Sequence, residues 1–273
     1  DWSSDVCSSD CVTMITMQKI DDINIHNNES TYDIGYKELD KVLGGLKSGS
    51  IITIGSRPAI GKSTFINNII FKMLEQYNLP TLFVSLTEVK ESFMLRFSTI
   101  LMDIPYNNLR DDMNLKTESS MKLKDKKFNL YVSDNCYKIN DLEKLIEENK
   151  DIKVLVIDYI QLMGSDKECK SKTDEFNDVL NRLRIITNKY GLIVFILSQL
   201  SRSVERRIDN RPLLADLSSS GDLEYVSDTV ILLYRDGYYN ENNNNILEVI
   251  ISKNRSGACG LIHLDYNSNK TKL

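Results

Sequence analysis

Residues 49–64 read GSIITIGSRPAIGKST, and this stretch decides the fold. GSIITIG is a short run rich in β-branched residues, which favours a strand. RPAIGKST follows as a glycine- and proline-containing turn, and residues 65–77, FINNIIFKMLEQY, have the apolar spacing of an amphipathic helix. The sequence therefore predicts a strand, a tight turn and a helix in immediate succession.

The turn between this strand and helix predicts a phosphate site. Backbone N–H groups of a glycine-rich turn, together with a helix N-terminus, form a cradle for phosphate oxygens. Lys62 is placed to reach the β- and γ-phosphates of a nucleotide, and the Ser63 hydroxyl to ligate Mg²⁺. The usual spacing GxxxxGK[ST] would begin with glycine at position 56, where this chain has Ser56 and a glycine one residue earlier. The alternative is a chance GKS in a surface loop.

The predicted nucleotide-binding residues are Ser56, Arg57, Pro58, Ala59, Ile60, Gly61, Lys62, Ser63 and Thr64.

Two more apolar runs end in polar residues that suit the same site. In VLVIDYIQLM, four apolar residues lead to Asp158, at the place where a strand-end carboxylate holds magnesium through water. An aspartate that ends a strand is also common in turns. In GLIVFILSQLSR, Gln199 closes a strand that should neighbour the strand of Asp158, where its amide can bond the γ-phosphate or its water. The alternative for Gln199 is a capping role.

The rest of the chain predicts an α/β fold with a mainly parallel central sheet flanked by helices. Continuous apolar strands that alternate with helices indicate a parallel sheet covered on both sides. After residue 227 the pattern changes to a C-terminal β-hairpin that turns at Ser256–Gly257. Polar residues 105–127 end in KLKDKK, which predicts a solvated face, with a DNA contact as the alternative. Further strands are predicted at 81–86, 128–134, 153–158, 191–199 and 228–234, and helices at 36–45, 90–102 and 173–190.

Composition narrows the class of protein. The chain has 273 residues, 41% hydrophobic and 27% charged, and a net charge of −5, so no global basic field indicates nucleic acid. A local basic groove stays compatible with that balance. No apolar run approaches the roughly 20 residues that span a bilayer, so we expect no membrane partner. Cys136, Cys169 and Cys259 are far apart, which argues against a zinc site or disulfides and favours a reducing, cytoplasmic location.

The two ends of the domain organisation are read from composition. Residues 1–13 lack the charged and apolar regions of a signal peptide and resemble translated adapter sequence, so they predict a non-native or disordered leader. The polar, Asn-rich residues 14–33 predict an entry linker, and residues 34–273 form the main domain.

Six blocks occur in order along the chain: RPAIGKS, SLTEVKESFMLR, VLVIDYIQLM, LSQLSRSVERR, RPLLADLSSSGDLEYVSDTVILLYRDGYY and IISKNRSGACG. Together they resemble the C-terminal motor domain of the DnaB-type replicative DNA helicases, which are RecA-like P-loop ATPases, from about Gly35 to about Leu264. The resemblance implies a RecA-like sheet and a homo-hexameric ring. ATP would bind with Mg²⁺ at the subunit junctions. Single-stranded DNA would pass through the centre, and duplex DNA would be unwound 5′ to 3′ during replication, with a primase and a helicase loader as candidate partners.

The resemblance also implies roles for individual residues. Asp158 would be the Walker B carboxylate and Gln199 the γ-phosphate sensor, while Lys253 and Arg255 align with a basic pair that reaches a neighbour's ATP. The segment from Ser201 to Gly221 matches the region that lines the channel, and it is locally basic, as phosphate contacts require. Plain solvated charge is the alternative for each arginine. The predicted DNA-binding residues are Arg202, Arg206, Arg207, Arg211, Ser220 and Gly221.

Departures from the family pattern carry predictions of their own. The family reads SLEMS where this chain has SLTEV, so Thr87 stands at the place of the catalytic glutamate. Thr87 cannot act as a carboxylate base, and the adjacent Glu88 can do so only if the strand end bends or slips by one residue, because neighbouring strand residues point to opposite faces. Loss of a general base typically costs about 10²–10⁴ in rate. ATP binding is therefore predicted separately from fast hydrolysis.

Two further departures concern DNA and domain content. DLSSSG stands where the family commonly has DLRESG, so Ser218 and Ser219 would hold phosphates more weakly than a charged pair. The family's N-terminal domain does not precede the motor blocks, which predicts a fragment or a domain-reduced, phage-like version. A hydrolysis-impaired RecA-like assembly or DNA-binding module is the alternative function, and another RecA-like ATPase, such as a recombinase, is a third.

Overall fold

The computed structural model describes residues 31–217, 220–240, 245–267 and 272–273. The predicted leader, most of the entry linker, and Ser218 and Ser219 lie outside the described residues. Among the described residues, no helix is long and apolar enough to cross a membrane.

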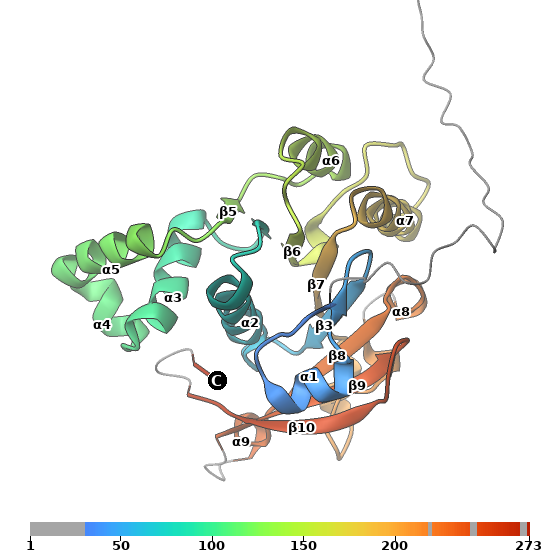
Figure 1. The fold of residues 1–273 in the computed structure, drawn as a ribbon. Helices are drawn as coiled ribbons and strands as arrows, with labels where there is room; N and C mark the ends of the chain where they lie inside the picture. Colours follow the sequence, from blue (N-terminus) through green and yellow to red (C-terminus); the bar gives the residue numbers. More distant parts are fainter. Residues whose placement is uncertain (1–30, 218–219, 241–244, 268–271) are drawn as a thin grey trace, which may run out of the picture.

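An eight-stranded sheet forms the centre of the molecule, in the order β10-β9-β8-β3-β7-β6-β4-β5 (Figure 1). The strands from β8 to β5 pair in parallel, whereas β9 and β10 are antiparallel neighbours that close one side of the sheet. This confirms the mainly parallel sheet and the C-terminal hairpin, whose loop contains the predicted turn at Ser256–Gly257. The strands are β3 (Ile51–Ser56), β4 (Thr81–Ser85), β5 (Leu130–Ser133), β6 (Val154–Asp158), β7 (Ile193–Gln199), β8 (Thr229–Tyr234), β9 (Ile246–Asn254) and β10 (Gly260–Asp265), and a separate two-stranded sheet joins β1 (Thr31–Tyr32) to β2 (Leu46–Lys47).

Helices cover the sheet, and the alternation of strand residues decides which helix each residue meets. On one face, Ile52 and Ile54 of β3 pack with the buried residues of α2 and α3. On the other, Val194 and Ile196 of β7 pack with α6, α7 and α8. The helices are α1 (Lys37–Leu43), α2 (Lys62–Tyr77), α3 (Lys90–Met102), α4 (Tyr106–Asp111), α5 (Met113–Lys126), α6 (Ile139–Glu148), α7 (Lys172–Tyr190), α8 (Ser220–Val226) and α9 (Asp236–Tyr239).

Helices α4, α5 and α6 were not predicted, nor were the short helices α8 and α9. Helix α5 has no apolar stripe, since its one fully buried residue is Ser119, and its start is fixed by the Asp112 side chain, which accepts two backbone N–H groups. Helix α6 did carry a signal, because Ile139, Leu142 and Ile146 repeat at helical spacing and are buried.

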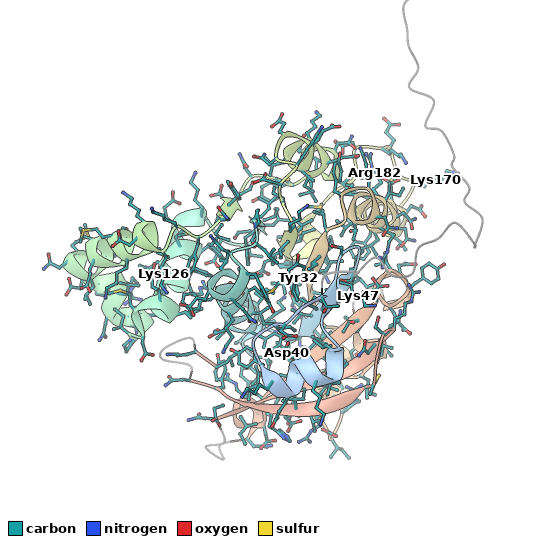
Figure 2. The ribbon with its side chains drawn as sticks, viewed as in Figure 1. Tyr32, Asp40, Lys47, Lys126, Lys170 and Arg182 are labelled. Atoms are coloured by element: carbon teal, nitrogen blue, oxygen red, sulfur yellow. The ribbon has the colours of Figure 1, made fainter. Side chains whose placement is uncertain are left out.

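The KLKDKK run is the largely exposed end of α5, and this exposure agrees with the predicted solvated face and equally with the alternative of a DNA contact. Figure 2 shows where Lys126 of this run lies. Its ammonium pairs with Glu75 of α2 at 2.7 Å. This ion pair ties the end of α5 to the helix that follows the phosphate turn.

Candidate active site

The predicted phosphate turn lies where the parallel strands end. Ser56 of β3 is the register partner of Gln199 of β7, and Asp158 of β6 is the partner of Ser85 of β4. Since β6 and β7 are also neighbours, the polar ends of four strands meet at one edge, as the sequence predicts for Asp158 and Gln199. A pocket of about 340 Å³ opens there, and it is lined by Ser56, Arg57, Pro58, Ala59, Gly61, Lys62, Ser63, Thr64, Thr87, Arg96, Asp158, Tyr159, Gln199 and Tyr266.

Packing favours the glycine at position 55, one residue before the usual first glycine of the motif. A Cβ on Gly55 would lie 2.8 Å from Leu200 and 3.0 Å from Leu232, so a larger residue would require these side chains to shift. Ser56 is buried at the end of β3, where its hydroxyl donates to the Arg57 carbonyl at 3.0 Å. The glycine at 55 therefore serves the core, and the phosphate turn begins after it.

The second glycine of the motif is required by the backbone. Gly61 has φ of +120° directly before α2, a conformation that L-residues rarely adopt, and a Cβ there would lie 2.8 Å from the Tyr266 ring. Of the nine predicted nucleotide-binding residues, Ile60 alone does not line the pocket, because its side chain is buried in the core. The Arg57 guanidinium lies at the same turn and is bonded to the Leu200 carbonyl at 2.7 Å and to Glu205.

Lys62, Ser63 and Asp158 form the charged floor of the pocket. The Ser63 hydroxyl donates to Asp158 Oδ2 at 3.1 Å, and Lys62 Nζ lies 5.4 Å from the centre of the Tyr159 ring. Burial lowers the pKa of Lys62, although the charge of Asp158 opposes this shift. Burial likewise raises the pKa of Asp158, and Lys62, Ser63 and Arg96 oppose that shift. Burial thus disfavours the charged form of both groups, and the charge of each group partly offsets this effect on the other.

A hydroxyl and a carboxylate are oxygen donors that fit Mg²⁺. The described residues contain no group of three or more His, Cys, Asp or Glu side chains that can hold a metal. A site with one hydroxyl and one carboxylate matches the habit of Mg²⁺, which keeps several waters and binds one or two carboxylates plus substrate phosphates. The donor set therefore fits magnesium bound together with a nucleotide.

Thr87 lines the pocket, and Glu88 does not. Strand β4 ends at Ser85, so residues 86–88 form a bend, which the Ser85 hydroxyl closes by donating to the Glu88 carbonyl at 2.7 Å. The Glu88 carboxylate accepts a hydrogen bond from Arg96 Nη2 at 2.6 Å. Burial and the charge of Asp158 raise the pKa of Glu88, and Arg96 opposes them. The only carboxylate in the SLTEV segment is thus engaged beside the pocket.

Three pocket residues were not predicted: Arg96, Tyr159 and Tyr266. Arg96 carries a local signal, because it is the one charged residue in the apolar stretch FMLRF of α3. Tyr266 carries none, since the sheet topology alone brings the end of β10 to Gly61. The Arg235 guanidinium stacks on the Tyr266 ring at 4.4 Å and donates to the Ala59 carbonyl at 3.1 Å, which braces this wall.

The predicted DNA-binding arginines divide into two kinds. Arg207 pairs with buried Asp216 at 2.7 Å, and Arg211 pairs with buried Glu248 at 2.7 Å, so both have structural partners. Arg202 and Arg206 lie exposed on the short helix η3 (Arg202–Arg206). Gly221 is exposed in α8, which begins at Ser220.

Lys253 and Arg255 lie near the amino-terminal ends of the parallel strands, whereas the pocket lies at their carboxyl ends. The Arg255 N–H donates to the Asp228 carbonyl, and the Asp228 N–H donates to the carbonyl of Ile51, the first residue of β3. The pocket lies at the carboxyl end of β3. The two ends of this strand, Ile51 and Ser56, are about 17 Å apart at the ordinary rise of a strand. Residues 255–259 are exposed. These two cations therefore face away from their own chain's phosphate turn.

A parallel sheet whose central strand enters a GKS turn, with a carboxylate at the end of a nearby strand, defines a RecA-like P-loop NTPase domain. The family model of the DnaB-like helicase C terminal domain matches residues 32–273. The chain belongs to this family.

Similar proteins agree with that assignment. A "Probable replicative DNA helicase" of Trieres chinensis is 36% identical over an alignment 257 residues long, which covers 88% of this chain and 56% of that protein. A "Replicative DNA helicase DnaB" of Buchnera aphidicola (strain APS) is 30% identical over 91% of this chain and 57% of its own length. The chain thus spans somewhat over half the length of these relatives. A solved structure that is titled as an ATPase domain superposes with a TM-score of 0.82 at 28% identity, over 91% of this chain and 92% of that one.

Proposed function

We propose that this chain is the motor domain of an ATP-dependent replicative DNA helicase, which moves along single-stranded DNA as a homo-hexameric ring in the cytoplasm and unwinds the duplex. The observation that carries the proposal is the separation of two charged sites on one sheet. The phosphate turn lies at the carboxyl ends of the parallel strands. Lys253 and Arg255 lie near the amino-terminal ends of the same strands, beyond reach of that turn. Cations so placed suit a triphosphate bound by an adjacent copy.

ATP with Mg²⁺ is the proposed cofactor. Lys62 would bind the β- and γ-phosphates, and the Ser63 hydroxyl and Asp158 carboxylate would hold the metal. When bound, the ion neutralises phosphate charge. Gln199 lines the same pocket at the end of β7, where its amide would contact the γ-phosphate or its water.

A primase and a loader remain candidate partners. One solved structure similar to this chain, with a TM-score of 0.82, is titled as a DnaB-like replicative helicase and its interactions with primase. This chain covers 62% of that one, so contacts made by the rest of the longer chain have no counterpart in the part compared.

The DNA contact is proposed for the exposed arginines. Changing Arg202 and Arg206 together to alanine is expected to weaken binding of single-stranded DNA and to reduce the salt slope of log K by about 1.4, or about 0.7 per lost phosphate contact. Fluorescence anisotropy of a labelled oligonucleotide between about 50 and about 200 mM salt measures this slope. The Arg110→Ala variant is the control. Arg110 is an exposed arginine in the lobe of α3 to α5, which is the group formed by helices α3, α4 and α5. An unchanged slope in the double variant would remove these two residues from the DNA site.

A second candidate function is an assembly module that binds ATP but hydrolyses it poorly. Two observations favour it: Thr87 lines the pocket at the place of the family's glutamate, and Glu88 is bonded to Arg96. In this second function, the ring would form and bind DNA when nucleotide is bound. Slow ATP hydrolysis would then only release the assembly.

Two variants separate these functions. Thr87→Glu is expected to raise ATP turnover by about 10²–10⁴, because it returns a general base to the pocket. Glu88→Ala is expected to change turnover much less than Thr87→Glu does, since Glu88 itself does not line the pocket and its loss acts on the pocket only by freeing Arg96. Both are measured as ATPase with and without single-stranded DNA, and Thr87→Ser serves as a control that adds no carboxylate. Native turnover that disappears in Glu88→Ala would instead assign the base to Glu88.

A further inference from the structure

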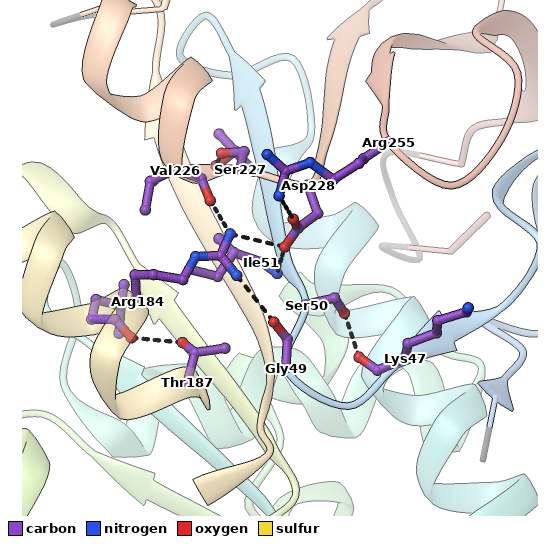
Figure 3. A network of polar contacts seen from close by, with 12 residues as sticks. Lys47, Gly49, Ser50, Ile51, Arg184, Thr187, Val226, Ser227, Asp228 and Arg255 are labelled. Carbon is purple, nitrogen blue, oxygen red and sulfur yellow. Dashed lines mark hydrogen bonds and ion pairs between the residues drawn. The ribbon is translucent and has the colours of Figure 1, made fainter. Parts of the chain in front are cut away.

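One carboxylate, that of Asp228, is shared by two arginines at the edge of the sheet opposite the phosphate turn (Figure 3). Asp228 Oδ2 accepts from Arg184 Nη2 at 2.9 Å and from the Ile51 N–H at 2.9 Å. Asp228 Oδ1 accepts from Arg255 Nη1 at 2.9 Å. The residue lies between α8 and β8, and its backbone is held as well, because its N–H donates to the Ile51 carbonyl and its carbonyl accepts from the Arg255 N–H.

Arg184 makes the anchor of this cluster rigid. It comes from α7, and its guanidinium also donates to the Gly49 carbonyl at 3.0 Å and to the Val226 carbonyl. The side chains of Arg184 and Asp228 are 24% and 16% exposed. Arg184 therefore joins helix α7, the end of α8 and the start of β3 around one acceptor that is largely buried.

Arg255 is held more loosely than Arg184. Its side chain is 64% exposed, and among the described residues the structure gives its guanidinium one partner, Asp228. A guanidinium has five N–H donors in a planar fork, so a single bond to Asp228 restrains the group while it leaves most donors facing solvent. Arg255 is therefore oriented by its own chain, and most of its N–H donors are available to bind another group.

The cluster also carries excess positive charge. Lys253 Nζ donates to the Glu224 carbonyl of α8 at 2.5 Å, and burial together with the nearby charge of Arg255 lowers the pKa of Lys253. Two of the cations, Arg184 and Arg255, pair with the one carboxylate of Asp228, while the charges of Glu224 and Asp228 only oppose the lowering of the Lys253 pKa. An anion that approaches the exposed side of the hairpin would neutralise this excess positive charge.

We propose that Asp228, itself fixed by Arg184, is a positioning residue that orients Arg255 toward the triphosphate of an adjacent copy. The role rests on the proposed function of the hairpin cations. Asp228 does not touch the nucleotide; it sets the direction of a group that does. A purely structural role is the competing account, in which Asp228 only ties β8 to β3 through Ile51.

Mixed rings distinguish these accounts. All chains carry Thr87→Glu, so that turnover does not depend on the native carboxylate. In that background, Asp228→Asn keeps an oxygen for the Ile51 N–H and removes the charge that pairs with both Arg255 and Arg184. It is expected to lower kcat for ATP about 10- to 100-fold, the usual effect of a small misplacement, while KM changes less than about threefold. Asp111→Asn, in the exposed pair with Arg110, is the matched control.

The decisive step is to mix subunits before assembly. Asp228→Asn subunits mixed with Lys62→Ala subunits are expected to regain turnover, because the Lys62→Ala subunit presents an intact Asp228–Arg255 pair to its neighbour's intact pocket. Asp228→Asn mixed with Arg255→Ala should regain none. A loss in Asp228→Asn that Lys62→Ala does not repair, or no loss at all, would overturn the positioning role. If Arg255→Ala itself leaves turnover unchanged, the trans role of the hairpin fails, and the role of Asp228 fails with it.

Discussion

In the Thr87→Glu background, Lys62→Ala is expected to lower ATP turnover by at least about 10³ and to weaken ATP binding about 10- to 100-fold. The binding loss corresponds to one hydrogen bond to a charged group, about 1.5–3 kcal/mol. The larger loss in turnover follows because the ammonium also stabilises charge that develops on the phosphates in a site with little water. Equilibrium binding of a fluorescent ATP analogue and steady-state ATPase measure the two effects.

The control for Lys62 is another lysine of the same chain. Lys122→Ala, on the exposed face of α5, removes the same charge far from the pocket and should change neither quantity. Removal of Lys62 leaves the Asp158 carboxylate buried without its nearest opposing charge, so the fold of the variant is checked by thermal unfolding. A folded Lys62→Ala chain that binds ATP normally would contradict the assignment of the turn at 55–64.

Arg255→Ala is expected to lower kcat by about 10³–10⁵, the range measured for trans-acting arginines in other NTPases. Its own pocket is about 17 Å away along β3, so binding of ADP should stay within about threefold of the unmodified chain. The measurement is ATPase in the Thr87→Glu background together with ADP binding. Because Arg255 is largely exposed, its loss should leave the thermal unfolding midpoint nearly unchanged.

Arg110→Ala supplies the comparison for Arg255. Arg110 is also an exposed arginine with one aspartate partner, and it lies in the lobe of α3 to α5. Equal turnover in Arg255→Ala and Arg110→Ala would show that the hairpin cation takes no part in hydrolysis.

Local pattern was enough to predict the strands and helices that surround the phosphate turn. A strand rich in β-branched residues, a glycine turn and an amphipathic helix are each decided within a few residues, so β3, Gly61 and α2 follow from GSIITIGSRPAIGKST. Asp158 and Gln199 follow because the carboxyl ends of parallel strands meet at one edge. The polar helix α5 could not be found this way, since it buries almost nothing and its stability comes from a cap and from its packing on the lobe.

The remaining contacts depend on topology. Tyr266 reaches Gly61 only because β10 is added at the far side of the sheet, and Asp228 meets Arg184 only because α7 and α8 cover the same face. The arginines of residues 202–211 look alike in sequence, yet Arg207 and Arg211 pair with buried carboxylates that lie 9 and 37 residues further along the chain. Single-sequence reasoning gives no means to separate them from Arg202 and Arg206.

The placement of the two charged edges has a consequence for assembly. If copies associate as proposed, the phosphate pocket at one end of β3 would meet the Lys253–Arg255 hairpin loop of the next copy, so the contact would join two different surfaces. An open row of such copies would always contain one pocket without a hairpin loop and one hairpin loop without a pocket. Only a closed ring would leave neither unpaired, so every defect in closure should cost the assembly one working site.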